Sequence, residues 1–181
     1  MRVITGSAKG RRLETLSGDD VRPTTDRVKE AVFSIIQFQV QGRDFLDLFA
    51  GSGQMGIEAL SRGAKTATFV DSAKQALSVI RKNLKSAGLE ENARVFSMDS
   101  IGFLTLKGGE FDVAFLDPPY KSGLLQSSLA LLPGAMRKSG VILCESPLDE
   151  ELPQNAGDFV LDREYRYGKI KITSFRHKDF I

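Results

Sequence analysis

A chain of 181 residues has room for one α/β domain with a small extension, and it contains no run of eighteen apolar residues that would suggest a membrane span. Its single cysteine, Cys144, excludes an internal disulfide and, with the single His177, argues against a structural zinc site, so we expect a cytoplasmic protein without membrane or metal partners. The net charge is only +2, but basic residues gather in 1–12 and 163–178, which suggests a polarised surface.

Residues 1–42 are predicted to form an N-terminal appendage. Two short runs flank the glycine-containing segment 6–10, a pattern typical of a hairpin, here with a basic tip. Apolar residues then recur at helical spacing over 28–36, which predicts a helix with one core-facing side. Thr24 or Thr25 can cap the start of that helix.

Residues 43–181 are predicted to form the main domain, in which strands and helices alternate. The expected strands are 44–49, 66–71, 94–98, 111–116 and 140–145, followed by an antiparallel hairpin of 159–167 and 169–176. The expected helices are 54–62, 73–87 and 124–132, with a short one ending at Leu106. Ser72 is expected to cap the helix 73–87 and Gly88 to end it. The pattern predicts the α/β class, with a doubly wound, mostly parallel, seven-stranded sheet.

Residues 51–56, with the sequence Gly-Ser-Gly-Gln-Met-Gly, follow the first strand of this domain and open its first helix. Glycine lets the backbone turn sharply and approach a ligand closely, and the start of a helix offers free N–H groups. Asp71 lies twenty residues after Gly51. This arrangement fits two classes of cofactor, a dinucleotide or S-adenosylmethionine (SAM).

Acidic residues stand at or just after the ends of four expected strands: Asp47, Asp71, Asp99 and Asp117. Because parallel strands end at the same edge of a sheet, we expect these carboxylates to gather there. The last of them begins the segment 117–120, Asp-Pro-Pro-Tyr, whose two prolines remove N–H donors and leave acceptors beside the carboxylate. Acceptors beside a stacking ring suit a planar heterocycle that bears an NH₂ group.

These motifs together resemble the RsmD family, bacterial methyltransferases that act on the guanine exocyclic amine in small-subunit (16S) ribosomal RNA. The resemblance rests on residues 22–33 (Arg-Pro-Thr-Thr-Asp-Arg-Val-Lys-Glu-Ala-Val-Phe), 47–53 (Asp-Leu-Phe-Ala-Gly-Ser-Gly), 117–120 and Tyr167-Gly168. It covers essentially the whole chain. It implies a Rossmann-like class I methyltransferase fold, SAM as cofactor, and ribosomal RNA, free or within an assembling particle, as partner.

The resemblance also implies two groups of site residues. SAM would be held by Asp47, Phe49, Ala50, Gly51, Ser52, Gly53, Asp71, Ser72, Asp99 and Ser100. Within this group, Asp71 would accept the ribose hydroxyls and Asp99 the adenine amine. The catalytic segment would be Asp117, Pro118, Pro119 and Tyr120, in which Asp117 and the Pro118 carbonyl bind the guanine amine and Tyr120 stacks on the base.

The basic N-terminal surface is a separate indication of RNA binding. A SAM-binding fold does not itself need this extra basic surface, so we expect it to line the RNA path. The residues expected to contact RNA are Lys9, Arg11, Arg12, Arg22, Thr24 and Arg27.

Three alternatives remain open at this level. An adenine-N6 methyltransferase shares Asp-Pro-Pro-Tyr, although a DNA-specific enzyme of that kind needs a sizeable target-recognition domain, for which 181 residues leave no room. An NAD-dependent oxidoreductase fits the glycine motif, but Asp-Pro-Pro-Tyr has no role in hydride transfer. A non-catalytic RNA-binding module would not need the acids at the strand ends.

Overall fold

The computed structural model describes residues 1–16, 26–106 and 111–181. Its strands are β1 (Asp44–Asp47), β2 (Thr66–Asp71), β3 (Ala93–Ser97), β4 (Phe111–Leu116), β5 (Met136–Pro147), β6 (Asn155–Ala156), β7 (Phe159–Tyr167) and β8 (Ile170–His177). Its α-helices are α1 (Asp26–Ile35), α2 (Gln54–Ser61), α3 (Lys74–Ala87), α4 (Ser100–Leu106) and α5 (Leu124–Leu131). None of the helices in the described ranges is long and apolar enough to cross a membrane.

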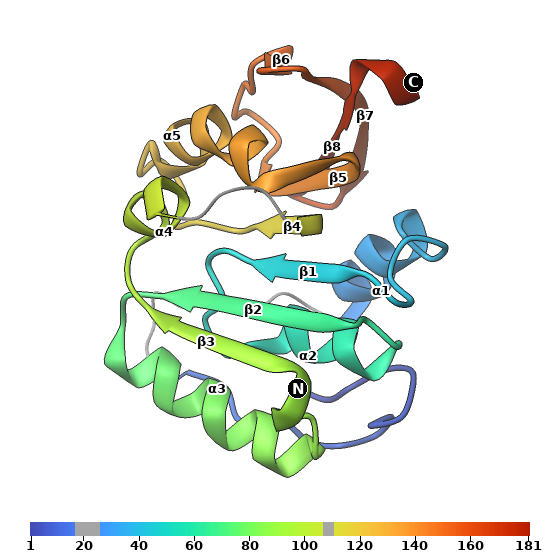
Figure 1. Ribbon diagram of the computed structural model, residues 1–181, viewed down its shortest axis with the longest axis vertical. Coiled ribbons are helices and arrows are strands. Elements are labelled where there is room, and N and C mark those ends of the chain that lie inside the picture. The colour runs from blue at the N-terminus through green and yellow to red at the C-terminus, as the bar shows by residue number, and fades with distance from the viewer. Residues whose placement is uncertain (17–25, 107–110) are drawn as a thin grey trace.

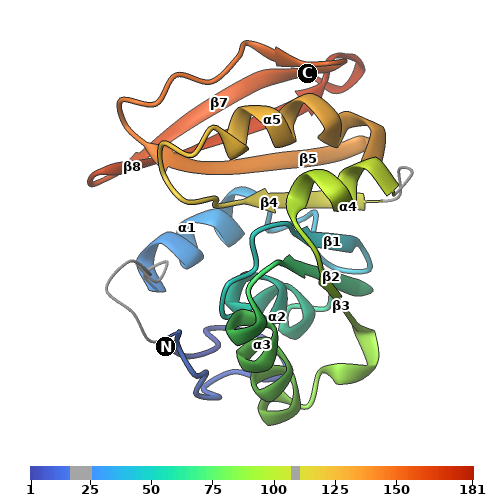
Figure 2. The same cartoon turned by 90° about the vertical axis from the view of Figure 1, so that its left-hand side faces the viewer.

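The eight strands form one sheet in the order β3-β2-β1-β4-β5-β8-β7-β6, which Figures 1 and 2 show stacked from β3 at the bottom towards β7 at the top. The strands from β3 to β5 run parallel, whereas β8 and β7 are antiparallel to their neighbours. The predicted doubly wound, mostly parallel α/β class is therefore confirmed. The sheet has one strand more than predicted because the two-residue β6 pairs with β7.

Alternate residues of the parallel strands enter two different cores, one on each face of the sheet. Phe69 and Phe115 belong to the core that α1, α2 and α3 cover. Val70 and Leu116 belong to the core that α4 and α5 cover. Strand β4 is buried along its whole length, as its apolar sequence predicts, and Cys144 on the neighbouring strand is buried as well.

The start of α3 differs from the prediction. Its N-cap residue is Ala73 rather than Ser72, and no side chain of the cap residue accepts a hydrogen bond there. Instead, Oδ1 of Asp71 accepts a hydrogen bond from the Ala73 N–H at 2.8 Å. Gly88 ends α3 with φ of 69°, as predicted. The last residue of β2 therefore fixes both the end of its strand and the start of the next helix.

The predicted N-terminal hairpin is present as a single antiparallel bridge between Arg2 and Arg12. It lies beside α2 and α3, in dark blue in Figures 1 and 2. Val3 and Leu13 join the same core as α2. The division into an appendage of 1–42 and a main domain of 43–181 stays a prediction.

A buried carboxylate on α2 holds the hairpin in place. Glu58 accepts hydrogen bonds from the N–H groups of Ile4 at 2.8 Å and Thr5 at 3.0 Å. It also pairs with Arg62 at 2.8 Å and with Lys29, on α1, at 3.7 Å. Burial lowers the pKa of Lys29, although Glu58 opposes that change. Because removing one partner of a buried ion pair leaves a charge uncompensated, this cluster fixes the hairpin and α1 relative to the sheet.

Gly56 allows α2 to lie close against β2. A Cβ atom at this position would stand 2.3 Å from the Phe69 ring, so alanine forces the helix and strand apart. We expect Gly56→Ala to lower the free energy of unfolding by about 1–3 kcal/mol, because overpacking outweighs the better helix propensity of alanine. Urea unfolding measures the change. Gly134→Ala is the matched control, since nothing lies within 4 Å of its Cβ position; equal stabilities of the two variants would contradict the prediction.

Candidate active site

A cavity of about 780 Å³ opens at the carboxyl ends of the parallel strands. It lies where β1 and β4 end side by side, between the connection from β1 to β2 and the connection from β4 to β5. Open α/β sheets bind ligands at such a position, because the two connections leave in opposite directions and a crevice forms between them.

The cavity brings together most of the residues predicted for the site. All four residues of the Asp-Pro-Pro-Tyr segment line it: Asp117, Pro118, Pro119 and Tyr120. Nine of the ten residues predicted to hold the cofactor line it as well: Asp47, Phe49, Ala50, Gly51, Ser52, Asp71, Ser72, Asp99 and Ser100. Gly53 does not, although its φ of 77° makes the turn into α2. The roles of these residues remain predictions.

The predicted RNA-binding residues are divided. Arg27, at the start of α1, lines the cavity, whereas Lys9, Arg11 and Arg12 are exposed on the hairpin and do not. Arg22 and Thr24 lie outside the described residues, as does the expected helix cap at Thr24 or Thr25.

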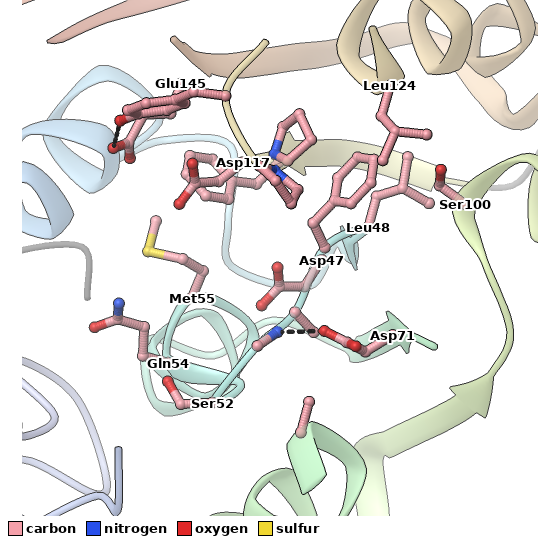
Figure 3. A pocket seen from close by; sticks show the side chains of 18 of the residues that line it. Asp47, Leu48, Ser52, Gln54, Met55, Asp71, Ser100, Asp117, Leu124 and Glu145 are labelled. Carbon is pink, nitrogen blue, oxygen red and sulfur yellow. Dashed lines mark hydrogen bonds between the residues drawn. The ribbon is translucent and has the colours of Figure 1, made fainter. Parts of the chain in front are cut away.

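Backbone N–H groups and two strand-end acids hold the glycine loop. Gly51 donates a hydrogen bond to Oδ2 of Asp71 at 2.9 Å, the dashed contact beside Asp71 in Figure 3. Gly56 donates to Oδ2 of Asp47 at 3.0 Å. A carboxylate has about four lone-pair sites, so Asp71 keeps capacity for ligand hydroxyls after its bonds to Gly51 and Ala73.

Asp47 is a buried acid with only 2% of its surface exposed. Burial raises its pKa to about 7, and the charges of Asp117 and Asp71 act in the same direction, while the hydrogen bond from Gly56 opposes them. Figure 3 shows the carboxylates of Asp47 and Asp117 turned towards the same central space. A cation bound in that space would favour the ionised form of Asp47.

The segment after β4 is held in a sharp bend. Lys121 has φ of 59°, and it is the one residue other than glycine with positive φ in the described parts of the chain. Such a backbone is uncommon for a residue with a side chain and fixes the direction in which the chain leaves Tyr120. Tyr120 is 40% exposed, and its hydroxyl lies 3.4 Å from Oε1 of Glu145 on β5. An accessible aromatic ring thus stands beside two acids, Asp117 and Glu145.

Several lining residues were not predicted. They are Leu16, Val28, Leu48, Gln54, Met55, Ala73, Ala76, Met98, Phe115, Leu124, Glu145 and residues 167–170. Glu145 was detectable, because it ends the predicted strand 140–145 and therefore belongs to the same edge as the four aspartates. Leu16 carried no such signal, since its position depends on how the N-terminal segment packs.

Asn83 on α3 brings the N-terminal segment to the cavity. Its Oδ1 accepts from the Glu14 N–H at 2.7 Å, and its Nδ2 donates to the carbonyl of Glu14 at 3.0 Å and to that of Ser52 at 2.9 Å. One buried amide thus joins the N-terminal segment to the glycine loop. Leu16, two residues after Glu14, becomes part of the cavity wall as a result.

A family model, curated relatives and solved structures each match nearly the whole chain. The family model described as conserved hypothetical protein 95 matches residues 1–176. The chain is 40% identical to YlbH of Bacillus subtilis (strain 168) over 183 residues, covering 98% of this chain and 100% of the relative. It is 36% identical to Ribosomal RNA small subunit methyltransferase D of Escherichia coli (strain K12), and the match covers 98% of this chain and 90% of that relative. The solved structure of yhhF from Escherichia coli superposes on it with a TM-score of 0.89 at 33% identity. The superposition covers 98% of this chain and 97% of the yhhF chain.

The raised pKa of Asp47 predicts a pH-dependent stability. Below its usual value of 3.8 both folded and unfolded chains hold the proton, whereas between 3.8 and about 7 the folded chain binds it more tightly. The contribution of Asp47 to stability is thus lost as pH rises through about 7. The difference in unfolding free energy, wild type minus Asp47→Asn, should fall between about pH 4 and 7 in urea titrations and stay constant above that range.

Asp44, at the other end of β1, is the matched control. Burial pushes the pKa of Asp44 up, but hydrogen bonds from Thr66 and Arg137 bring it below its usual value. The corresponding difference for Asp44→Asn should therefore be flat over the same pH range. A flat difference for Asp47→Asn as well would show that Asp47 titrates normally.

Proposed function

The chain belongs to the family of conserved hypothetical protein 95, the RsmD family that its sequence resembles, and on that premise we propose that it transfers a methyl group from SAM to the exocyclic amine of a guanine in small-subunit ribosomal RNA. The relative of 36% identity carries the name Ribosomal RNA small subunit methyltransferase D, which supports ribosomal RNA as the substrate class. That substrate agrees with the cytoplasmic location expected from the sequence.

One observation carries the proposal. The Asp-Pro-Pro-Tyr segment at the end of β4 opens into the same cavity as the glycine loop and the acids at the ends of β1 and β2. A cofactor held at the loop and a base held at Asp117 would therefore lie next to each other. An oxidoreductase or a plain RNA-binding module would not need Asp-Pro-Pro-Tyr beside the glycine loop.

The volume and the charge of the cavity support SAM as the cofactor. A volume of about 780 Å³ is within the usual range for cofactor pockets. The wall carries five carboxylates, those of Asp47, Asp71, Asp99, Asp117 and Glu145. SAM is cationic at its sulfur and its ammonium group, so this negative wall favours it electrostatically. Asp71 would bind the ribose hydroxyls, and apolar side chains such as Met98 and Leu124 would flank the adenine.

The chemistry requires positioning of the guanine amine rather than a strong base. Asp117 and the Pro118 carbonyl would accept its two N–H bonds, which localises the nitrogen lone pair that is otherwise delocalised into the ring. SAM supplies a methyl group on a positively charged sulfur, which leaves with the bonding electron pair as a neutral thioether. The amine becomes cationic as the new C–N bond forms, and the Asp117 carboxylate would stabilise that charge until a proton leaves. Correct orientation of the two reactants alone can lower the activation barrier by about 7–11 kcal/mol in favourable cases.

The direct test is methyl transfer from radiolabelled SAM to small-subunit particles and to naked rRNA from cells that lack the enzyme. Nucleoside analysis then identifies the product. N2-methylguanosine supports the proposal, and N6-methyladenosine would establish the adenine alternative. Calorimetry that showed binding of NAD and not of SAM would replace the cofactor assignment.

Asp117→Ala should remove most of the activity without removing the cofactor. Loss of a group that stabilises transition-state charge lowers the rate by about 10²–10³-fold. SAM affinity should stay within about twofold, because SAM would be held mainly by the glycine loop, Asp71 and Asp99. Single-turnover methylation and SAM calorimetry separate the two effects. Asp149→Ala, an exposed acid outside the cavity, is the control. If Asp117→Ala lost rate and SAM affinity equally, Asp117 would have to be a SAM-binding residue instead of one that acts on the guanine amine.

Replacement of Lys9, Arg11 and Arg12 by glutamine tests the proposed RNA path. Each lost phosphate contact should lower the slope of log affinity against log salt concentration by about 0.7–0.9, and RNA affinity should fall. Binding at several salt concentrations measures both. Lys65→Gln with Lys138→Gln is the control, because these exposed cations lie near the opposite, amino ends of β2 and β5. An unchanged slope for the triple variant would make the hairpin a purely structural element.

A further inference from the structure

Glu145 is a buried acid in the wall of the cavity, with 6% of its surface exposed. It lies on β5, directly beside β4, where Leu116 pairs with Cys144. Asp117 follows Leu116 and Glu145 follows Cys144, so the two acids stand at the same level of the sheet edge. The mechanism above assigns Glu145 no role beyond its charge.

The alternation of the two strands places both acids on one face. Phe115 on β4 and Leu143 on β5 belong to the core covered by α1 to α3, and each acid follows two residues later. Figure 3 shows Glu145 at the side of the cavity nearest Asp117, with the dashed contact to a tyrosine hydroxyl. That hydroxyl belongs to Tyr120, at 3.4 Å. A base that stacks on Tyr120 and donates its amine to Asp117 would thus have its neighbouring edge beside Glu145.

We infer that Glu145 is the specificity-determining residue of the base pocket and accepts the N1–H of guanine; this inference rests on the proposed function. In guanine, the ring atom beside the exocyclic amine on the Watson–Crick edge is N1, which carries a hydrogen. In adenine, the corresponding atom is an unprotonated nitrogen with a lone pair. An ionised carboxylate only accepts hydrogen bonds, so it attracts the first and repels the second.

The hydrogen bond from Tyr120 does not by itself prevent Glu145 from accepting one from a base. A carboxylate has about four lone-pair sites, and the Tyr120 hydroxyl occupies one of them. The pairing of a carboxylate with base N–H groups is an established form of readout, and a good contact discriminates bases by about 10- to 100-fold. Asp117 and the Pro118 carbonyl accept from an amine of either base, whereas Glu145 distinguishes the ring atom next to it.

The first experiment compares the wild type with Glu145→Gln, which keeps the shape of the side chain and loses its charge. We expect kcat/KM for RNA methylation to fall about 10- to 100-fold, as for loss of a hydrogen bond to a charged group, with SAM affinity unchanged in calorimetry. Asp149→Asn is the matched control and should keep wild-type kinetics. Glu145→Asp keeps the charge one methylene further from the base and should be intermediate. Thermal unfolding verifies that each variant is folded.

The second experiment changes the base. The guanine that the wild type methylates is replaced in a synthetic RNA by 2-aminopurine, which keeps the 2-amino group but has an unprotonated N1. The wild type should prefer guanine strongly. In Glu145→Gln that preference should shrink by at least about tenfold, because the amide NH₂ can donate to the N1 lone pair. The wild-type preference requires no variant and is therefore independent of folding.

Glu145 could alternatively act only by positioning Tyr120, and Tyr120→Phe tests this. If the inference is correct, Glu145→Gln has the same effect with or without the Tyr120 hydroxyl. Loss of that effect in Tyr120→Phe, or an equal preference for guanine over 2-aminopurine in wild type and Glu145→Gln, would overturn the inference while methylation of guanine continued. A wild-type enzyme that produced no methylated guanine would instead overturn the proposed function.

Discussion

The site depends on the adjacency of β1 and β4 in the sheet and on the opposite directions in which the chain leaves them. From β1 it passes through α2, on one face, to β2; from β4 it passes through α5, on the other face, to β5. A crevice between these two connections follows from topology alone. Side chains decide what the crevice binds: the glycine loop ends β1, and Asp-Pro-Pro-Tyr ends β4. Two reactants held at these two turns would lie next to each other because β1 and β4 are adjacent strands.

Crowding of carboxylates at this edge has an energetic cost that a cationic ligand would offset. The burial of Asp47 and the nearby charges of Asp117 and Asp71 raise its pKa to about 7. In the protein alone, these acids repel one another. The proposed reaction presents a positive sulfur first and a positive amine afterwards, and both would relieve the repulsion. Fixed charges of this kind need no reorganisation when the transition-state charge develops, which is how preorganised sites accelerate reactions.

The fold and the centre of the site could be predicted from the sequence, because both depend on local patterns. An apolar run such as 111–116, glycines at 51 and 53, and acids at strand ends each act through their immediate neighbours. The predictions that were wrong or incomplete required tertiary information. Ser72 was an acceptable cap by sequence, but Asp71 reaches the same N–H from the strand end. Leu16 lines the cavity, and Asn83, on a helix far along the chain, helps to hold it there by binding the backbone of Glu14. No sequence pattern marks such a contact.

One sheet with its helices carries both the cavity and the exposed cations of the N-terminal segment, so we expect target recognition within these residues to be divided among a few short elements. The N-terminal segment, tied to α2 through Glu58 and to the glycine loop through Asn83, supplies exposed cations that can bind phosphate irrespective of sequence. In the proposed function, the choice of the base would come from the cavity. There, Asp117 and the Pro118 carbonyl would accept equally well from any exocyclic amine, and Tyr120 would stack on any base. Glu145 stands beside these groups as an acceptor for the neighbouring ring atom. On this inference, a single buried carboxylate on the adjacent strand would convert a general amine site into one that selects guanine.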